Sequence, residues 1–154
     1  MAGETQEAST GWGGEVWLST DDDVGNLTEL VDVRSFTPGS SSVERVETTT
    51  LKSPGRRRTY TKGMIDSGEA QIVLNARRGS DTYTLLKAAQ VDAGERYVRF
   101  NYPELGELTW TQDVMGEVTN VDEGEVTPDG NMEMTVTISL GEVIADAAYV
   151  APNP

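Results

Sequence analysis

The sequence predicts a mainly β protein, an antiparallel β-sandwich or barrel with one flanking α-helix. Short segments that alternate apolar and polar residues recur along the chain, separated by turns rich in Gly, Pro, Asn and Asp. Only residues 80–90 place apolar side chains at helical spacing. The 154 residues fit one domain that can bury a core without disulfides, which the absence of cysteine excludes.

Two stretches near the N-terminus are predicted strands. Residues 1–14 are small and polar and predict a flexible arm. Residues 15–20 and 27–36 alternate well enough for strands, with an Asp-rich turn at 21–26 between them. That turn matches a calcium loop only in part, because its glycine and glutamate fall at the wrong spacing, so a solvated turn is the better interpretation.

The segment 42–76 predicts two strands joined by an unusually long polar loop. A polar strand at 42–50 is followed by the loop 51–63 and by a strand at 69–76. Hairpin loops usually have two to about five residues, so this connection is long. A mobile solvated loop, a nucleic-acid patch and a contact with carboxylates of a neighbouring subunit are the alternatives. The acidic character of the chain favours the contact with a neighbouring subunit.

The helix at 80–90 has Ser80 or Asp81 as its N-cap and carries an apolar stripe that predicts packing on a sheet. The helix-packing residues of this stripe are Tyr83, Leu85 and Leu86.

The C-terminal third predicts further strands and a second arm. A strand at 95–102 is expected to end at Pro103. Residues 108–121 form either one strand or a pair of strands with a bulge near Gly116. A hairpin turn at 127–131 precedes the clearest alternation in the chain, at 132–140. The remaining residues, 145–154, are small and proline-terminated and predict an arm.

Composition excludes several functions. The chain has no histidine and no cysteine, so serine–histidine and cysteine–histidine nucleophile systems are impossible. Paired carboxylates remain formally open, but no catalytic constellation is present, and we expect neither an enzyme nor a bound cofactor or metal. No apolar run reaches the length of a membrane span, and the polar N-terminus has no signal-peptide pattern. We therefore expect a soluble protein without membrane insertion.

Charge is unevenly distributed along the chain. The formal net charge is −14, from 26 acidic and 12 basic residues. All basic residues lie between Arg34 and Arg99, and the chain after residue 99 carries acids only. A basic segment on an acidic chain allows attraction between copies of the chain.

The order and spacing of these segments resemble the tail tube (major tail) protein of long-tailed bacteriophages. The resemblance covers most of residues 15–141. It rests on the segments Val31–Gly39, Val46–Leu51, Gly63–Glu69 and Leu85–Leu86, followed by a strand near 97–100.

This resemblance implies hexameric rings that stack into a hollow tube and conduct DNA from the capsid to the host cell. It implies a tail-tube domain at 15–144 between arms at 1–14 and 145–154. The ring-stacking loop falls on Leu51, Lys52, Arg56, Arg57, Arg58, Tyr60 and Lys62. Polar strands are candidates for an acidic lumen wall that repels DNA phosphates, through Glu44, Glu47, Thr49, Gln71 and Asn75.

The resemblance also implies the partners and the location. The partners are other copies of the chain, tape-measure, tail-terminator and baseplate or tip proteins, and double-stranded DNA that passes without specific binding. The location is the virion tail, assembled in the host cytoplasm. Tubes of gene transfer agents, contractile tails and secretion systems remain alternatives. A sandwich-type binding module, such as an adhesin or a carbohydrate-binding domain, is a further one.

Overall fold

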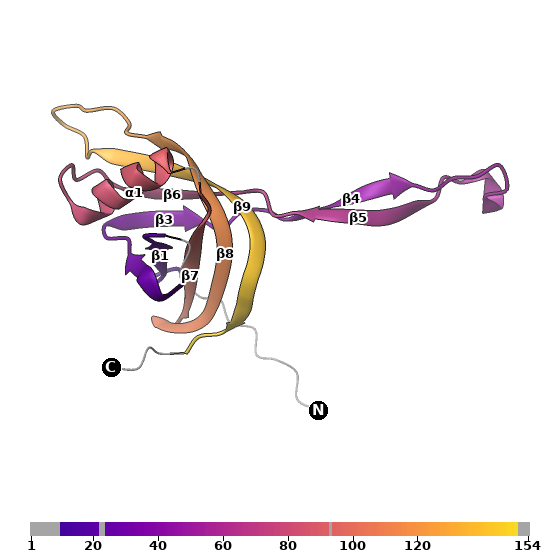
Figure 1. Ribbon diagram of the computed structural model, residues 1–154, viewed down its shortest axis with the longest axis horizontal. Helices are drawn as coiled ribbons and strands as arrows, with labels where there is room; N and C mark the ends of the chain where they lie inside the picture. The colour runs from indigo at the N-terminus through magenta and orange to yellow at the C-terminus, as the bar shows by residue number, and fades with distance from the viewer. Residues whose placement is uncertain (1–9, 22–23, 93, 151–154) are drawn as a thin grey trace.

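A curved body and a thin two-stranded arm make up the molecule, as the computed structural model in Figure 1 shows. The structure describes residues 10–21, 24–92 and 94–150. Among these residues, nine strands and the helix α1 (Asp81–Val91) are present, with short 3-10 turns η1 (Val24–Asn26) and η2 (Pro54–Arg56). The mainly β class with one flanking helix is confirmed.

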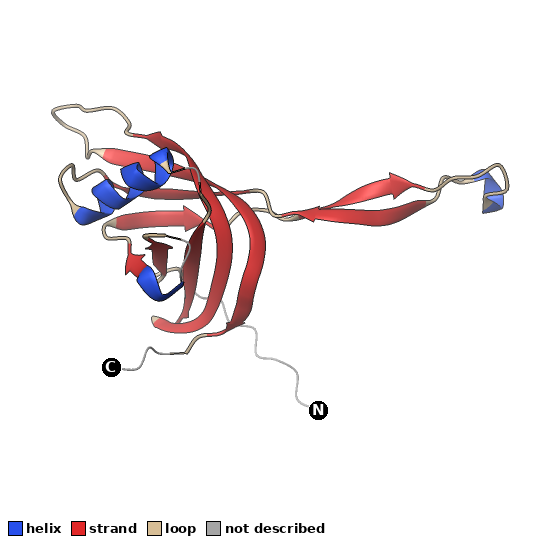
Figure 2. Cartoon of the chain, viewed as in Figure 1, coloured by secondary structure: helices blue, strands red, loops and turns tan. Residues whose placement is uncertain are grey.

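The body is a single seven-stranded antiparallel sheet with the order β2-β1-β7-β8-β9-β6-β3. Its two longest strands bend strongly, so the sheet curves around its own core (Figure 2). The strands are β1 (Glu15–Ser19), β2 (Leu27–Glu29), β3 (Val33–Thr37), β6 (Glu69–Asn75), β7 (Arg96–Glu104), β8 (Glu107–Asp122) and β9 (Glu133–Ala148).

The core lies on the side of the sheet that α1 covers. On β6, Ala70, Ile72 and Leu74 are buried, as their alternation predicts. They pair with buried residues of β9. Aromatic rings extend the core, because Phe36 stacks on Phe100 with ring centroids 5.4 Å apart. The largest fully buried side chains include Leu18, Ile72, Leu74, Leu86, Phe100, Met134 and Ile138.

The helix forms where the sequence predicts it. The Ser80 side chain accepts a hydrogen bond from the backbone N–H of Tyr83, so Ser80 is the N-cap. Leu86 is buried in the core, and Tyr83 and Leu85 pack against it half-buried. The helix-packing residues therefore lie on the predicted face of the helix.

The arm consists of β4 (Ser42–Glu47) and β5 (Tyr60–Asp66), which pair only with each other. The prediction of a loop from 51 to 63 is wrong at both ends, because the loop between the two strands spans 48–59 and Tyr60 to Gly63 belong to β5. The second predicted strand, 69–76, was expected to follow this loop directly. It corresponds to β6, which belongs to the body sheet and does not pair with β4. All residues of β4 and β5 are exposed, so they have no alternation of burial that a sequence pattern could reveal.

The predicted strand 27–36 is two strands at opposite edges of the sheet. β2 pairs with β1, whereas β3 pairs with β6. Between them Asp32 has a φ of 64°, a left-handed conformation that ends an extended run. Side chains fix this bend, because Thr82 Oγ1 accepts a hydrogen bond from the backbone N–H of Val31 and Arg77 contacts Asp32 at 3.1 Å.

Two other boundaries differ from the predictions, at β7 and β9, whereas β8 matches one of the two alternatives. β7 continues through Pro103 to Glu104, with a shift in register between Tyr102 and Pro103 that accommodates the missing N–H. β8 is one strand rather than two, and its register shifts near Gly116 as expected. β9 continues to Ala148, because residues 145–148 pair with β8; the first four residues of the predicted C-terminal arm are therefore in the sheet.

Both predicted arms lie partly outside the described residues. Residues 1–9 of the N-terminal arm and 151–154 of the C-terminal arm are not described. The N-terminal arm boundary coincides with the start of β1 at Glu15. The predicted turn at 127–131 lies within a longer connection, 123–132, between the antiparallel strands β8 and β9.

Candidate assembly surfaces

The arm is the first candidate surface, because it projects from the body without covering any part of it (Figure 1). Its tip is held by short polar side chains: Thr48 Oγ1 and Thr59 Oγ1 are 3.1 Å apart, and Ser53 Oγ accepts from the Thr50 N–H at 2.8 Å. Gly55 and Arg56 both have positive φ, 63° and 59°, which turns the chain back. The tip is thus an ordered loop that presents its side chains to solvent.

The predicted ring-stacking residues all lie on this arm. Leu51, Lys52 and the three arginines are in the tip loop, whereas Tyr60 and Lys62 are in β5. Leu51 is fully exposed, although it is apolar. Arg58 makes a long contact of 3.8 Å with Glu47, and no salt bridge is present at Arg56 or Arg57 in the described part of the chain. The tip therefore carries cations that the same copy does not neutralise.

The register of β4 and β5 divides the arm into two faces. Val43 pairs with Ile65, and Arg45 pairs with Lys62, so β5 has one extra residue between these pairs. The arm's first face carries Val43, Arg45, Glu47, Tyr60, Lys62 and Ile65. The second face carries Glu44, Val46, Thr61, Gly63 and Met64. A Cβ placed on Gly63 would lie 3.1 Å from a Val46 methyl and 3.3 Å from a Glu44 carboxylate oxygen, which agrees with this division.

Four aliphatic side chains on the strands of the arm were not among the predicted contact residues. Val43, Val46, Met64 and Ile65 are all exposed, with Met64 at 82% and Ile65 at 69%. On a strand buried on one face, such residues would alternate with polar ones. Here each of the two strands carries apolar residues on both faces, so no alternation in the sequence marks them.

The outer face of the body sheet is the second candidate surface. Paired residues of β3, β6, β9 and β8 place polar side chains in rows on the side away from the core. One row contains Thr37, Gln71, Thr137 and Asn120; the next contains Ser35, Val73, Thr135 and Asp122; a third contains Glu69, Ser139 and Glu117. Arg34 forms an ion pair with Glu133 at this surface. Hydroxyls, amides and carboxylates therefore make up most of these rows.

The structure does not bring all predicted lumen residues together. Gln71 and Asn75 lie on the outer face of β6, half-buried or exposed. Glu44 and Glu47 are on the arm, on opposite faces of β4 because they are three positions apart along the strand. Thr49 lies beyond β4 in the tip loop. Of the predicted lumen residues, only Gln71 and Asn75 share one surface. Thr135 and Thr137 of β9 lie beside them there.

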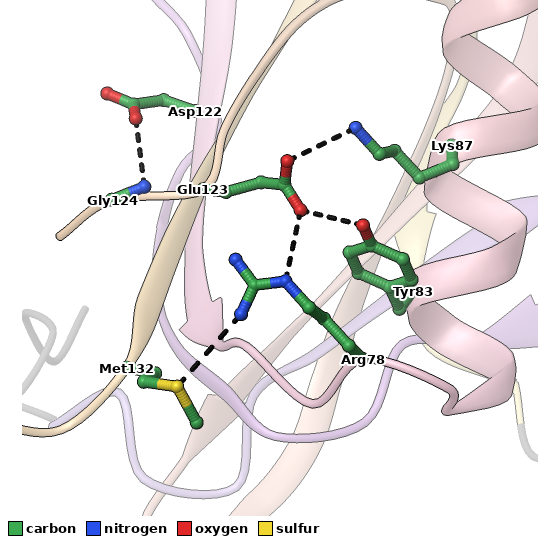
Figure 3. A network of polar contacts seen from close by, with 7 residues as sticks. All are labelled: Arg78, Tyr83, Lys87, Asp122, Glu123, Gly124 and Met132. Atoms are coloured by element: carbon green, nitrogen blue, oxygen red, sulfur yellow. Dashed lines mark hydrogen bonds and ion pairs between the residues drawn. The ribbon is translucent and has the colours of Figure 1, made fainter. Parts of the chain in front are cut away.

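A cluster around Glu123 holds the helix against the β8–β9 connection (Figure 3). Glu123 accepts hydrogen bonds from Tyr83 Oη at 2.6 Å and Lys87 Nζ at 3.4 Å, and its contact with Arg78 Nε measures 3.5 Å. The hydrogen bond from Tyr83, followed by the two cations, holds the pKa of Glu123 below its ordinary value. The same hydrogen bond raises the pKa of Tyr83. This cluster positions the helix and the β8–β9 connection. Its charged and hydroxyl groups contact one another within the chain.

Two further polar pairs, Arg99 with Asp113 and Tyr102 with Gln112, connect β7 to β8. Arg99 Nε donates to Asp113 Oδ1 at 2.7 Å, and its Nη2 donates to Asp113 Oδ2 at 3.0 Å. This bidentate contact raises the pKa of Arg99. Tyr102 Oη donates to Gln112, and burial, helped by Asp146, raises the pKa of Tyr102 to about 12. Both pairs have structural roles within the sheet.

No cluster of potential metal ligands is found in residues 10–21, 24–92 and 94–150. Within the same ranges, the structure contains no helix with the length and apolar character needed to cross a bilayer.

Comparison with known families gives one match over most of the chain. The model described as "Lambda phage tail tube protein, TTP" matches residues 15–143. Comparison with curated proteins finds no match.

Solved structures with this fold come from several tubular assemblies. A chain from the tail of an empty gene transfer agent particle, with C6 symmetry, has a TM-score of 0.70 at 16% identity, covering 93% of this chain and 100% of that one. A chain of the SPP1 tail tube has a TM-score of 0.64 at 11% identity, covering 95% and 81%. A chain of the anti-feeding prophage tube-terminating cap has a TM-score of 0.66 at 13% identity, covering 93% of each.

Proposed function

The chain belongs to the lambda phage tail tube protein family, and we propose that it forms hexameric rings that stack into a hollow tube for DNA. Membership makes it a structural subunit of a tail tube, as a component of the virion tail, rather than an enzyme. The ring number, the stacking contact and the passage of DNA are the proposal. The C6 symmetry of the gene transfer agent tail supports six subunits in a ring.

The observation that carries the proposal is the arm. A free two-stranded ribbon is marginally stable by itself in water, so an exposed one calls for a partner. This ribbon ends in Arg56, Arg57 and Arg58, on a molecule of net charge −14. Contact between the tip of one copy and carboxylates of another is therefore electrostatically favourable.

In this proposal the contact is head to tail, between the arm tip of one copy and the body of the next. The arm leaves one side of the body, and the β8–β9 connection lies on the other (Figure 1). When two different surfaces meet, a row of copies has one unused surface at each end. Such a contact therefore either adds further copies into an open assembly or closes into a ring. Both outcomes occur in a tube of stacked rings.

The outer face of the body sheet is the proposed lumen wall. Its rows of Ser, Thr, Asn and Gln side chains need water or polar contacts. Its acids, among them Glu69, Glu117 and Asp122, repel DNA phosphates, so passing DNA would not adhere. In this proposal Gln71 and Asn75 face the lumen, and Glu44, Glu47 and Thr49 of the arm line it only where the arm reaches the next ring.

The remaining partners follow from the function. A tube of fixed length needs tape-measure, terminator and baseplate or tip proteins, and related folds occur in a tube-terminating cap and in a sheath/tube terminator assembly. A gene transfer agent, a contractile tail or a secretion-system tube is the second candidate function. The 16% identity to a gene transfer agent tail chain is the observation that favours it.

Reversing the charge of the arm tip tests the stacking contact. The variant R56E/R57E/R58E should stay folded and form no stacked tubes by negative-stain electron microscopy, because like charges would then meet. The matched control R56K/R57K/R58K keeps the charge and should assemble, with fewer tubes of both control and wild type as salt rises. Normal tubes from the reversed variant would refute the tip contact.

A further inference from the structure

The two faces of the arm differ in charge as well as in position. The first face carries the cations Arg45 and Lys62, and its only acid, Glu47, already contacts Arg58 at 3.8 Å. The second face carries Glu44 and no cation in the described strands. Because the second copy is acidic, the two faces are not equivalent as docking surfaces.

The acidity of the rest of the chain makes this difference large. Residues 42–66 contain six basic and three acidic residues, whereas the remaining residues contain six basic and 23 acidic ones. The body that the arm meets is therefore negative on balance. The first face gains from such a contact, and Glu44 on the second face is repelled by it.

The first face also offers more than charge. Val43 and Ile65 form a cross-strand pair of exposed aliphatic side chains, and the Arg45 guanidinium lies 4.1 Å from the centroid of the Tyr60 ring. Aromatic and Arg side chains are enriched at protein interfaces, since they combine large apolar area with polar contacts. A stacked Arg–Tyr pair is already ordered before a partner binds, which lowers the entropy cost of association.

This face is continuous with a hollow in the body at the base of the arm. Ile65 lines the hollow together with Pro38, Leu140 and Val143. Val143 is exposed, so apolar surface is present on β9 as well as on the arm at this hollow. A partner seated on the first face would cover both the ribbon and the exposed apolar residues of this hollow.

We propose that the arm docks on a second copy of the chain through its first face alone. Val43 and Ile65 contribute apolar burial, Arg45 and Lys62 meet carboxylates of the second copy, and the second face stays in solvent. The proposal rests on the proposed self-assembly and adds to it the orientation of the arm. It predicts that part of the association free energy comes from apolar burial, which salt does not screen. The contribution of the tip arginines, by contrast, should weaken as salt rises.

Neighbouring residues on opposite faces provide the test. The chain has no cysteine, so Ile65→Cys and Met64→Cys each introduce a single thiol. Both positions are exposed in the single copy, at 69% and 82%, so both thiols should react at similar rates with a maleimide before assembly. In assembled tubes, separated from free subunits by sedimentation, the reaction at position 65 should slow by about tenfold or more and that at position 64 by less than about twofold.

The possible outcomes separate the two proposals. Equal protection at both positions would mean that both faces are covered, as in arms stacked on one another, and would overturn docking through one face. Unchanged reactivity at position 65 in intact tubes, or protection at position 64 alone, would overturn it as well. If neither the wild-type chain nor the two variants associate at any concentration, the proposed self-assembly itself is refuted, and the orientation of the arm with it.

Discussion

The body and the arm of this chain use β-pairing for opposite purposes. In the body, the inward residues of β6 and of the first half of β9 are almost fully buried, and their outward neighbours are polar except for Val73. In the arm, the residues of β4 and β5 are exposed on both faces, and apolar side chains are found on each. The body therefore gains its stability from within the chain, whereas the arm has apolar and charged groups that only a partner can cover.

This contrast teaches that stability and assembly reside in separate parts of the molecule. The arm begins and ends at adjacent points of the body, because Ser42 and Asp66 are paired. Changes in the body should alter unfolding, and changes in the arm should alter association. Four variants test that separation, in order of their expected effect on the free energy of unfolding.

The largest effect is expected from Phe100→Ala in the centre of the body. Phe100 is fully buried and stacks on Phe36, so its removal leaves a cavity. The free energy of unfolding should fall by about 3–5 kcal/mol. Urea denaturation followed by circular dichroism measures this loss, with Phe36 as a less buried position for comparison. A loss below about 1 kcal/mol would contradict the assignment of Phe100 to the core.

A smaller effect is expected from Arg99→Met, which removes one partner of the ion pair with Asp113. Asp113 is 8% exposed, so its carboxylate would lose both hydrogen bonds of the guanidinium in a poorly hydrated position. The free energy of unfolding should fall by about 1–3 kcal/mol. The double variant R99M/D113N should recover part of the loss, and a double variant as unstable as the sum of the single ones would argue against coupling.

Glu123→Gln should have a modest effect that depends on pH. The pKa of Glu123 is lowered in the folded state, first by the hydrogen bond from Tyr83. Its stabilising contribution is therefore complete above the carboxyl's unfolded pKa of about 4.3 and disappears as the pH falls through the lower folded pKa. Melting temperatures of variant and wild type should differ at pH 7 and converge in acid. A difference that grew in acid would contradict the direction of the shift.

The smallest effect on unfolding is expected from removal of the whole arm. Replacing residues 42–66 with a two-residue Asn-Gly turn should change the free energy of unfolding of the body by less than about 1 kcal/mol, because the arm covers none of the core. The same variant should form no tubes in the electron microscope. Loss of body stability would show that the two regions are coupled, and normal tubes would show that the arm is dispensable.

Local sequence patterns determined much of the body. The helix with its Ser80 cap, the alternating strand of Ile72 and Leu74, and the polar outer residues Gln71 and Asn75 were all predictable. Each depends on a repeat of 3.6 or two residues that records which side of an element faces the core. The family, and with it the function, was also predictable from the order of segments.

Only the tertiary structure decided which strands pair and which faces they present. The left-handed turn at Asp32 separates β2 from β3, and residues 145–148 extend β9 because β8 is long enough to pair with them. The extra residue of β5 places Ile65 beside Val43 and Met64 on the opposite face. A sequence pattern reports burial within one element, whereas pairing and register depend on partners distant in the chain. The arm is exposed on both faces in the single chain, and its partner is proposed to be another copy. Its sequence therefore has no alternation of apolar and polar residues that would mark a buried face.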